Sequence, residues 1–303
     1  MNLFISANDK FILPAKVMLT SFLMHHPTQI HHIYFLYSAV QEENLSMLEH
    51  LVRDHGSAFH PVQLQESDFS GFKCTSRFPL LVYFRLLACH YLPESEDRAL
   101  WMDVDLVVNG SVQAFYDQDF EGNAIVACRS ISEQDRPLLF GHPEGTVYCN
   151  AGVMLYNAAV LRTYQLSDFY AYYQAHEDLI LWQDQDILNG MFGGKIKALD
   201  NSTYNVQIRC GSGGAPYTLR YLQEEAKVIH FIGKIKPWHR MYFHRAASLW
   251  EQYYLKTCRK EGLQALCYRA AGSCRRCLVG IFLYIPWSLA RHLKKLLFPN
   301  GSH

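Results

Sequence analysis

The 303-residue sequence lacks the features that mark membrane-spanning, secreted and disordered proteins. It contains no run of about 18 uncharged apolar residues, the length that a transmembrane helix needs. The N-terminal segment has no basic region, and Asp9 and Lys10 interrupt its apolar stretches, which argues against a signal peptide. The nine cysteines are scattered, and only 18% of the residues are charged. We therefore expect a folded, soluble protein in a reducing compartment, the cytoplasm.

Basic residues are scarce outside the C-terminal tail. Residues 256–303 hold nine Lys or Arg and one acid, which leaves 19 basic and 27 acidic residues in the first 255. In this tail, the apolar stretch 277–290 is too short to span a bilayer and contains Pro286. Its basic and aromatic character predicts an amphipathic contact with an anionic membrane surface, and a helix packed on the main domain is the alternative. We expect no nucleic-acid partner.

Strand-length apolar runs alternate with helix-period segments over about the first 240 residues. This pattern predicts one α/β domain with a mostly parallel central sheet flanked by helices. We place the catalytic domain at residues 1–242 and a helical C-terminal region at 243–303. The predicted strands are 3–6, 33–37, 98–103, 124–128 and 153–157, and the predicted helices are 13–25, 42–54 and a segment around 83–91.

Two carboxylates directly follow one of these strands. Asp103 and Asp105 are two residues apart, so in extended chain they can point the same way. The carboxyl ends of strands are where ligands bind in open α/β sheets, and a divalent cation bridging a diphosphate would satisfy both charges. A solvated turn after the strand is the alternative interpretation.

A histidine, a glycine and two lysines follow a short apolar segment near the end of the predicted domain. His230 could supply a third metal ligand after the strand 227–229, and a mixed set of histidine and carboxylates favours Mn²⁺ over Mg²⁺. Gly233 would let backbone amides approach phosphate oxygens, and Lys236 would neutralise them. A partly buried histidine beside a basic loop is the alternative.

A third polar cluster opens a helix-period stretch at residues 183–189. Asp186 fits an acid in the first turn of a helix. Asp184 and Gln185 could instead hold sugar hydroxyls, because side chains at a rigid helix start are well positioned for this.

Taken together, these segments resemble glycosyltransferase family 8, in particular the bacterial lipopolysaccharide galactosyl- and glucosyltransferases. The resemblance follows the order of the motifs over about the first 240 residues. They are Phe4–Asp9, Tyr83–Leu86, Asp103–Asp105, Asn150–Val153, Gln183–Gly190, His230, Gly233 and Lys236–His239. The resemblance implies a nucleotide-diphospho-sugar transferase fold of the GT-A type, with retention of configuration at the anomeric carbon.

The resemblance also assigns roles to individual residues. Asp103, Asp105 and His230 look like ligands of Mn²⁺, with Mg²⁺ possible in its place. The expected nucleotide contacts are Ser6, Ala7, Asn8, Arg85, Val104, Gly233 and Lys236. Asn150, Ala151, Asp184 and Gln185 look like the donor-sugar pocket, and Asp184 and Gln185 are the predicted catalytic residues. Where relatives often carry an acid, this chain has Arg129 and Ser130.

The activity that the resemblance implies is transfer of galactose or glucose from a UDP-hexose to a terminal sugar of lipopolysaccharide or lipooligosaccharide. The site of action would be the inner face of the cell membrane. We favour front-face attack by the acceptor, because Gln185 is a poor nucleophile, and a double displacement through another acid stays open. The alternatives are a self- or protein-directed glucosyltransferase and a non-catalytic glycan-binding protein at the membrane.

Overall fold

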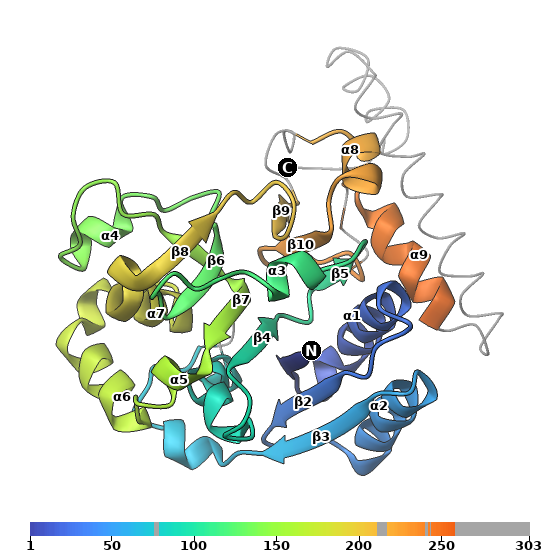
Figure 1. Ribbon diagram of the computed structural model, residues 1–303, viewed down its shortest axis with the longest axis horizontal. Helices are drawn as coiled ribbons and strands as arrows, with labels where there is room; N and C mark the ends of the chain where they lie inside the picture. The colour runs from blue at the N-terminus through green and yellow to red at the C-terminus, as the bar shows by residue number, and fades with distance from the viewer. Residues whose placement is uncertain (76–78, 211–216, 240–241, 243, 258–303) are drawn as a thin grey trace, which may run out of the picture.

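The computed structural model describes residues 1–75, 79–210, 217–239, 242 and 244–257, and a seven-stranded sheet forms its centre (Figure 1). In order across the sheet, the strands are β3 (Ala58–Gln63), β2 (His32–Tyr37), β1 (Asn2–Ser6), β4 (Arg98–Met102), β7 (Cys149–Asn157), β6 (Ile125–Arg129) and β8 (Ile196–Leu199). Only β7 runs antiparallel to its neighbours, β4 and β6, whereas the other four pairings are parallel. The mostly parallel sheet is as predicted, and the edge strands β3 and β8 are additions to it.

Helices cover both faces of this sheet. The α-helices are α1 (Ile12–His25), α2 (Glu42–Asp54), α3 (Gln113–Tyr116), α4 (Arg136–Leu139), α5 (Ala158–Leu161), α6 (Leu166–Ala175), α7 (Asp184–Phe192), α8 (Leu219–Glu224) and α9 (Ala247–Thr257). The helix expected around residues 83–91 is a 3₁₀ segment, η3 (Leu80–Tyr91). Helices α1 and α2 pack on one face, and η3, α6 and α7 pack on the other.

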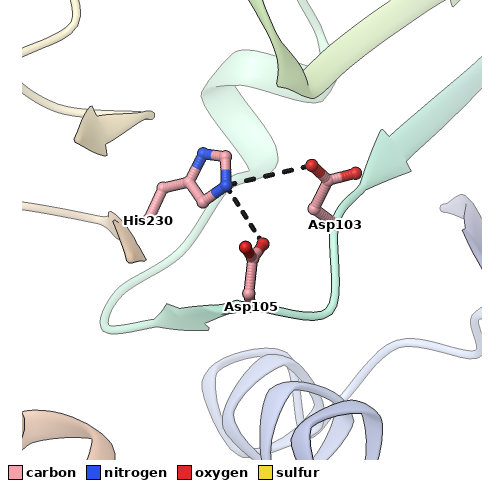
Figure 2. A group of neighbouring side chains, drawn as sticks. All are labelled: Asp103, Asp105 and His230. Carbon is pink, nitrogen blue, oxygen red and sulfur yellow. Dashed lines mark hydrogen bonds and ion pairs between the residues drawn. The ribbon is translucent and has the colours of Figure 1, made fainter. Parts of the chain in front are cut away.

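A second, three-stranded sheet lies beside the end of β4. It consists of β5 (Leu106–Val108), β10 (Val228–Ile232) and β9 (Val206–Arg209). His230 was expected after a strand, but it lies within β10, opposite Leu106 of β5. Because β5 begins directly after Asp105, this antiparallel pairing brings His230 beside both aspartates, as Figure 2 shows.

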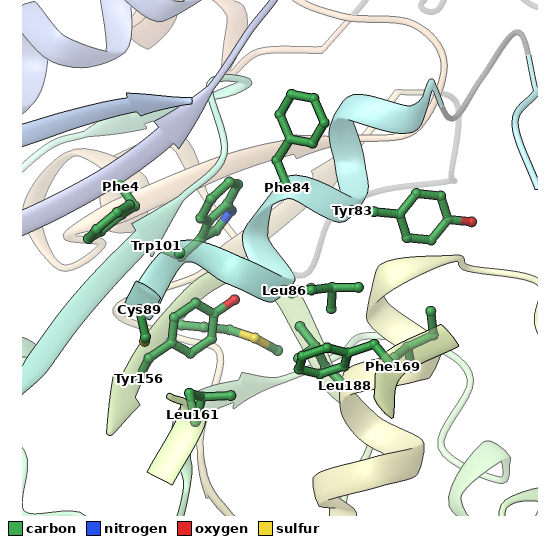
Figure 3. Close-up of a cluster of buried hydrophobic side chains, with 14 of the residues drawn as sticks. Phe4, Tyr83, Phe84, Leu86, Cys89, Trp101, Tyr156, Leu161, Phe169 and Leu188 are labelled. Atoms are coloured by element: carbon green, nitrogen blue, oxygen red, sulfur yellow. The ribbon is translucent and has the colours of Figure 1, made fainter. Parts of the chain in front are cut away.

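The core follows the two-residue alternation of the central strands. Phe4 of β1 and Trp101 of β4 are paired neighbours that point to the face covered by η3 and α7, and they share a buried cluster with Phe84 of η3 (Figure 3). Leu3 and Ile5 point to the opposite face, toward α1 and α2. Both faces of the central strands are thus buried, which explains why these segments are almost continuously apolar in sequence.

Helix α9 lies in the region that we predicted to follow the catalytic domain. It packs on α1, where Nε2 of His25 is 2.8 Å from the hydroxyl of Tyr253. The predicted membrane contact of the basic tail lies outside the described residues. Among the helices of the described part, none has the length and the apolar character required to cross a membrane.

Candidate active site

A cavity of about 560 Å³ opens where the central sheet meets the small sheet. Its wall combines the turn after β4, the start of β7, the start of α7 and the end of β10. Ten of the predicted site residues line it: Arg85, Asp103, Asp105, Asn150, Ala151, Asp184, Gln185, His230, Gly233 and Lys236. Segments that are up to about 150 residues apart in sequence therefore share one cavity, as the predicted roles require.

The two aspartates and the histidine form a compact group. Nε2 of His230 is 3.1 Å from Oδ1 of Asp105 and 3.8 Å from Oδ2 of Asp103. Adjacent ligands of an octahedral cation with bonds of about 2.1 Å lie roughly 3 Å apart, so this spacing accommodates a divalent cation with small side-chain movements. Two carboxylates and an imidazole also suit Mn²⁺ chemically. Among the described residues, Asp103, Asp105 and His230 form the group of three or more His, Cys, Asp or Glu side chains that lie close enough together to hold a metal ion.

Lys236 already compensates part of the negative charge of this group. Its ammonium group donates to Oδ2 of Asp105 and, at 2.7 Å, to the carbonyl oxygen of Phe231. Burial acts to raise the pKa of Asp105, but Lys236 and His230 together outweigh it and hold that pKa well below its usual range. Asp105 is therefore ionised at neutral pH, as a metal ligand must be.

Arg85 links the aspartate after β4 to the start of α7. Its guanidinium lies 2.7 Å from Oδ1 of Asp103 and 2.8 Å from Oδ2 of Asp184, and it donates to the carbonyl oxygen of Ala151 at 2.6 Å. Burial raises the pKa of Asp184 to about 7, against the opposing effect of Arg85. The side chain of Arg85 is only 6% exposed, so in this arrangement it positions two carboxylates.

Gln185 is held in place by the start of β7. Its Oε1 accepts hydrogen bonds from Nδ2 of Asn150 at 2.9 Å and from the backbone N–H of Ala151 at 3.0 Å. Its Nε2 donates to the hydroxyl of Tyr148 at 3.1 Å. The residues predicted for the donor-sugar pocket are thus in direct contact, although they come from segments about 35 residues apart.

The predicted nucleotide contacts near the N-terminus lie less directly at the cavity. Ser6 ends β1, which pairs with β4, and Ala7 and Asn8 follow it. None of these three residues lines the cavity, whereas Phe11, a few residues further on, does. The side chain of Asn8 accepts from the N–H of Lys10 and caps a 3₁₀ turn. Val104 is 8% exposed and packs in the core between the two aspartates.

Several residues of the cavity wall were missed by the sequence analysis. They come from the segment after β6 and from β9: Ser132, Glu133, Gln207 and Arg209, next to Ser130, which was named only as a departure from the family pattern. Glu133 has a φ of +67°, a left-handed conformation that is uncommon outside glycine. It brings a carboxylate to the cavity four residues after Arg129, in the segment where relatives were expected to carry an acid. No local motif marks these residues, because their place depends on how β6 and β9 are packed.

Comparisons with known proteins match most of this architecture. A family model described as glycosyl transferase family 8 matches residues 2–242. A lipopolysaccharide 1,2-glucosyltransferase of Escherichia coli is 21% identical over 256 residues, which cover 82% of this chain and 76% of the relative. A lipopolysaccharide 1,3-galactosyltransferase of Salmonella typhimurium is 23% identical over 257 residues, which cover 78% of this chain and 73% of the relative.

Solved structures show the same fold. The galactosyltransferase LgtC, in complex with donor and acceptor sugar analogues, superimposes with a TM-score of 0.73 at 23% identity, over 84% of this chain and 95% of that one. The glycosyltransferase GlyE of Streptococcus pneumoniae gives a TM-score of 0.65 at 22% identity, over 84% of this chain and 60% of that one. The predicted GT-A type of fold is thereby confirmed.

Proposed function

The chain belongs to glycosyltransferase family 8 and is a hexosyltransferase, and we propose that it transfers galactose or glucose from a UDP-sugar. In this proposal the acceptor is a terminal sugar of lipopolysaccharide or lipooligosaccharide, and the configuration at the anomeric carbon is retained. One observation carries this proposal. The group of Asp103, Asp105 and His230 opens into the same cavity as Asp184 and Gln185, so a cation site and a polar sugar pocket lie side by side. The glucosyltransferase and galactosyltransferase activities of the two lipopolysaccharide relatives support the hexose and the acceptor.

We propose Mn²⁺ as the cofactor, with Mg²⁺ as a weaker substitute, held by Asp103, Asp105 and His230. When bound, the cation would neutralise the negative charge that develops on the UDP leaving group. Lys236 lies against Asp105, within reach of the same diphosphate, and supplies a second fixed positive charge there. Gly233 has a φ of +90° and lines the cavity, so its lack of a side chain would let phosphate oxygens approach the backbone of this turn closely.

The surroundings of the carboxylates favour front-face attack by the acceptor hydroxyl over a covalent glycosyl intermediate. The described wall of the cavity carries Asp103, Asp105, Glu133 and Asp184. The first two face His230 as the candidate metal ligands, and Asp184 is paired with the buried Arg85. Asp186, the remaining acid of α7, is fully buried and accepts hydrogen bonds at both oxygens. A nucleophile needs an exposed, unpaired oxygen, which leaves Glu133 as the alternative to test.

A Glu133→Gln variant tests this mechanism. With front-face attack, the variant retains at least about a tenth of the turnover, because Glu133 then only contacts the acceptor. Complete loss of transfer, together with a hexose-sized mass adduct on Glu133 of the parent enzyme, would establish the double displacement instead.

We further propose that the enzyme acts in the cytoplasm at the inner face of the membrane, because its acceptor would be anchored there. Separation of soluble and membrane fractions, with and without a high-salt wash, tests this. Protein that stays soluble in the presence of anionic lipid vesicles argues against a peripheral location.

The activity itself is tested by a screen of UDP-sugars with short lipooligosaccharide acceptors in Mn²⁺, Mg²⁺ or EDTA, followed by NMR of the product. We expect an α-linked hexose from one UDP-hexose and no product in EDTA. A stable mass shift of the protein at a residue other than Glu133 would indicate a self-glucosylating enzyme. Glycan binding without UDP release would indicate a non-catalytic protein.

A further inference from the structure

A chain of side-chain hydrogen bonds runs from the candidate metal ligand on β10 to the candidate catalytic glutamine on α7. Nδ1 of His230 is 3.0 Å from Oδ1 of Asn205, and Nδ2 of Asn205 is 2.9 Å from Oδ1 of Asn150. Asn150 in turn donates from Nδ2 to Oε1 of Gln185 at 2.9 Å. Three amide side chains thus connect the cation site to the sugar pocket.

The end of this series of hydrogen bonds at Gln185 is anchored in the core. Nε2 of Gln185 donates to the hydroxyl of Tyr148, which donates to the buried carboxylate of Asp186. Arg136 pairs with Asp186 at 2.7 Å, and both side chains are at most 5% exposed. Asp186 also accepts from the N–H groups of residues 181 and 182, just before the strained Gln183, which has a φ of +49°. The end of the hydrogen-bonded series at α7 is therefore rigid.

Two backbone N–H groups fix the direction of every bond in the chain. The N–H of Gly152 faces one end of the Asn150 amide at 3.0 Å, so that end must be the oxygen. The N–H of Ala151 fixes Oε1 of Gln185 in the same way. Asn205 must then turn its NH₂ group toward Asn150 and its oxygen toward His230. Nδ1 of His230 consequently carries a proton, and Nε2 is the nitrogen that faces Asp103 and Asp105.

We propose that Asn205 is a positioning residue that presents Nε2 of His230 to the cation and holds Asn150 and Gln185 in register with it. Asn205 is fully buried and lies outside the cavity wall, so it acts through these partners. Hydrogen bonds to the second nitrogen of a metal-binding histidine commonly fix its tautomer and its ring orientation. The inference rests on the proposed function, because it assumes that a cation binds at His230.

The test compares two variants of Asn205 by calorimetric titration with Mn²⁺ alone and by the kinetics of transfer. Asn205→Leu removes both hydrogen bonds and should weaken Mn²⁺ binding by about 10- to 100-fold. Asn205→Asp keeps an acceptor for Nδ1–H of His230 but sets a carboxylate oxygen against Oδ1 of Asn150. It should therefore keep Mn²⁺ affinity within about threefold and lower kcat by at least about tenfold, since Gln185 loses its support.

A matched control separates these effects from a loss of buried polarity as such. Asn2→Leu removes a buried asparagine that bonds to Glu96 at 2.8 Å, at the amino end of β1, and should leave Mn²⁺ affinity unchanged. Equal Mn²⁺ affinity in Asn205→Leu and the parent would overturn the positioning role, and so would equal losses of Mn²⁺ affinity in the Leu and Asp variants. If the parent binds no Mn²⁺ even in the presence of UDP, the proposed function fails first and this inference with it.

Discussion

The imidazole of His230 lies directly against the α-carbon of Gly152. A β-carbon placed on Gly152 would be 2.1 Å from Cε1 and 2.6 Å from Nδ1 of the ring, far closer than atoms can approach. Gly152 belongs to a motif at the start of β7, whereas His230 lies in the other sheet. The absence of a side chain at Gly152 therefore allows the histidine to reach the two aspartates.

Gly152→Ala should accordingly displace His230 from the cation site. Because the buried ring lies between Gly152 and Asn205, it has to turn away. We expect Mn²⁺ affinity to fall at least about tenfold and stability to fall by about 1–3 kcal/mol. Calorimetry with Mn²⁺ and urea unfolding measure the two effects. Gly194→Ala is the control, since a β-carbon there meets nothing within 4 Å. Unchanged Mn²⁺ binding in Gly152→Ala would show that His230 is not a ligand.

Lys236→Met should change metal binding and nucleotide binding in opposite directions. Lys236 donates to Oδ2 of Asp105, so without nucleotide its ammonium group competes with the cation. Mn²⁺ alone should therefore bind more tightly to the variant. UDP in the presence of Mn²⁺ should bind about 10- to 100-fold more weakly, because a charged contact with the diphosphate is lost. The two titrations, run on the variant and on a Lys197→Met control, measure this. Changes in the same direction would contradict the assignment of Lys236 to the diphosphate.

Asp186→Asn should destabilise the fold strongly, because it leaves the buried Arg136 without a counter-charge. Breaking a buried ion pair from one side costs about 3–5 kcal/mol. By contrast, the exposed pair of Arg220 and Glu224 should contribute less than about 1 kcal/mol, which makes Glu224→Gln the matched control. Urea unfolding compares the two variants with the parent. A loss in Asp186→Asn no larger than in the control would refute the anchoring role of this pair.

Acid should destabilise the protein through His31. Its side chain is fully buried, and burial lowers its pKa from about 6.5 to about 4, so the folded state binds this proton less readily than the unfolded state. The contribution of neutral His31 to the free energy of unfolding is intact above pH 6.5. It is lost as the pH falls toward 4, by up to about 1.4 kcal/mol per pH unit. Unfolding free energies measured between pH 7 and 4.5 should fall less steeply in His31→Gln. The exposed His50→Gln should keep the slope of the parent. Identical slopes in all three proteins would exclude His31 as the cause.

Sequence patterns predicted the central strands and first helices well, because these strands are apolar runs buried on both faces and these helices are 13 and 14 residues long. The predicted helix 42–54 coincides with α2, and β1, β2 and β4 lie within one or two residues of their predicted ranges. The predictions were weaker for strands that form only by pairing with another strand. The strands β5 and β9 are three and four residues long, and neither forms without β10 between them. Their short segments carry too little periodicity to be recognised.

The same limit applies to the site. The motif of Asp103 and Asp105 is local, and it is visible because both residues directly follow the buried strand β4. Asn205 has no such signal, since its importance comes from lying between His230 and Asn150 in three dimensions. Arg136 and Asp186 are likewise 50 residues apart, and their pairing follows only from the packing of α4 against α7.

The central claim is that a divalent cation held by Asp103, Asp105 and His230 carries the diphosphate of the donor. It is tested most directly by calorimetric titration of UDP into the parent and into Asp105→Asn, with and without Mn²⁺. Asp105 is the better position to change, because Asp103 bonds to Arg85, which also holds Asp184 at the start of α7. We predict that Mn²⁺ strengthens UDP binding to the parent at least about tenfold and has no such effect on the variant. Equal strengthening in both proteins would contradict the account.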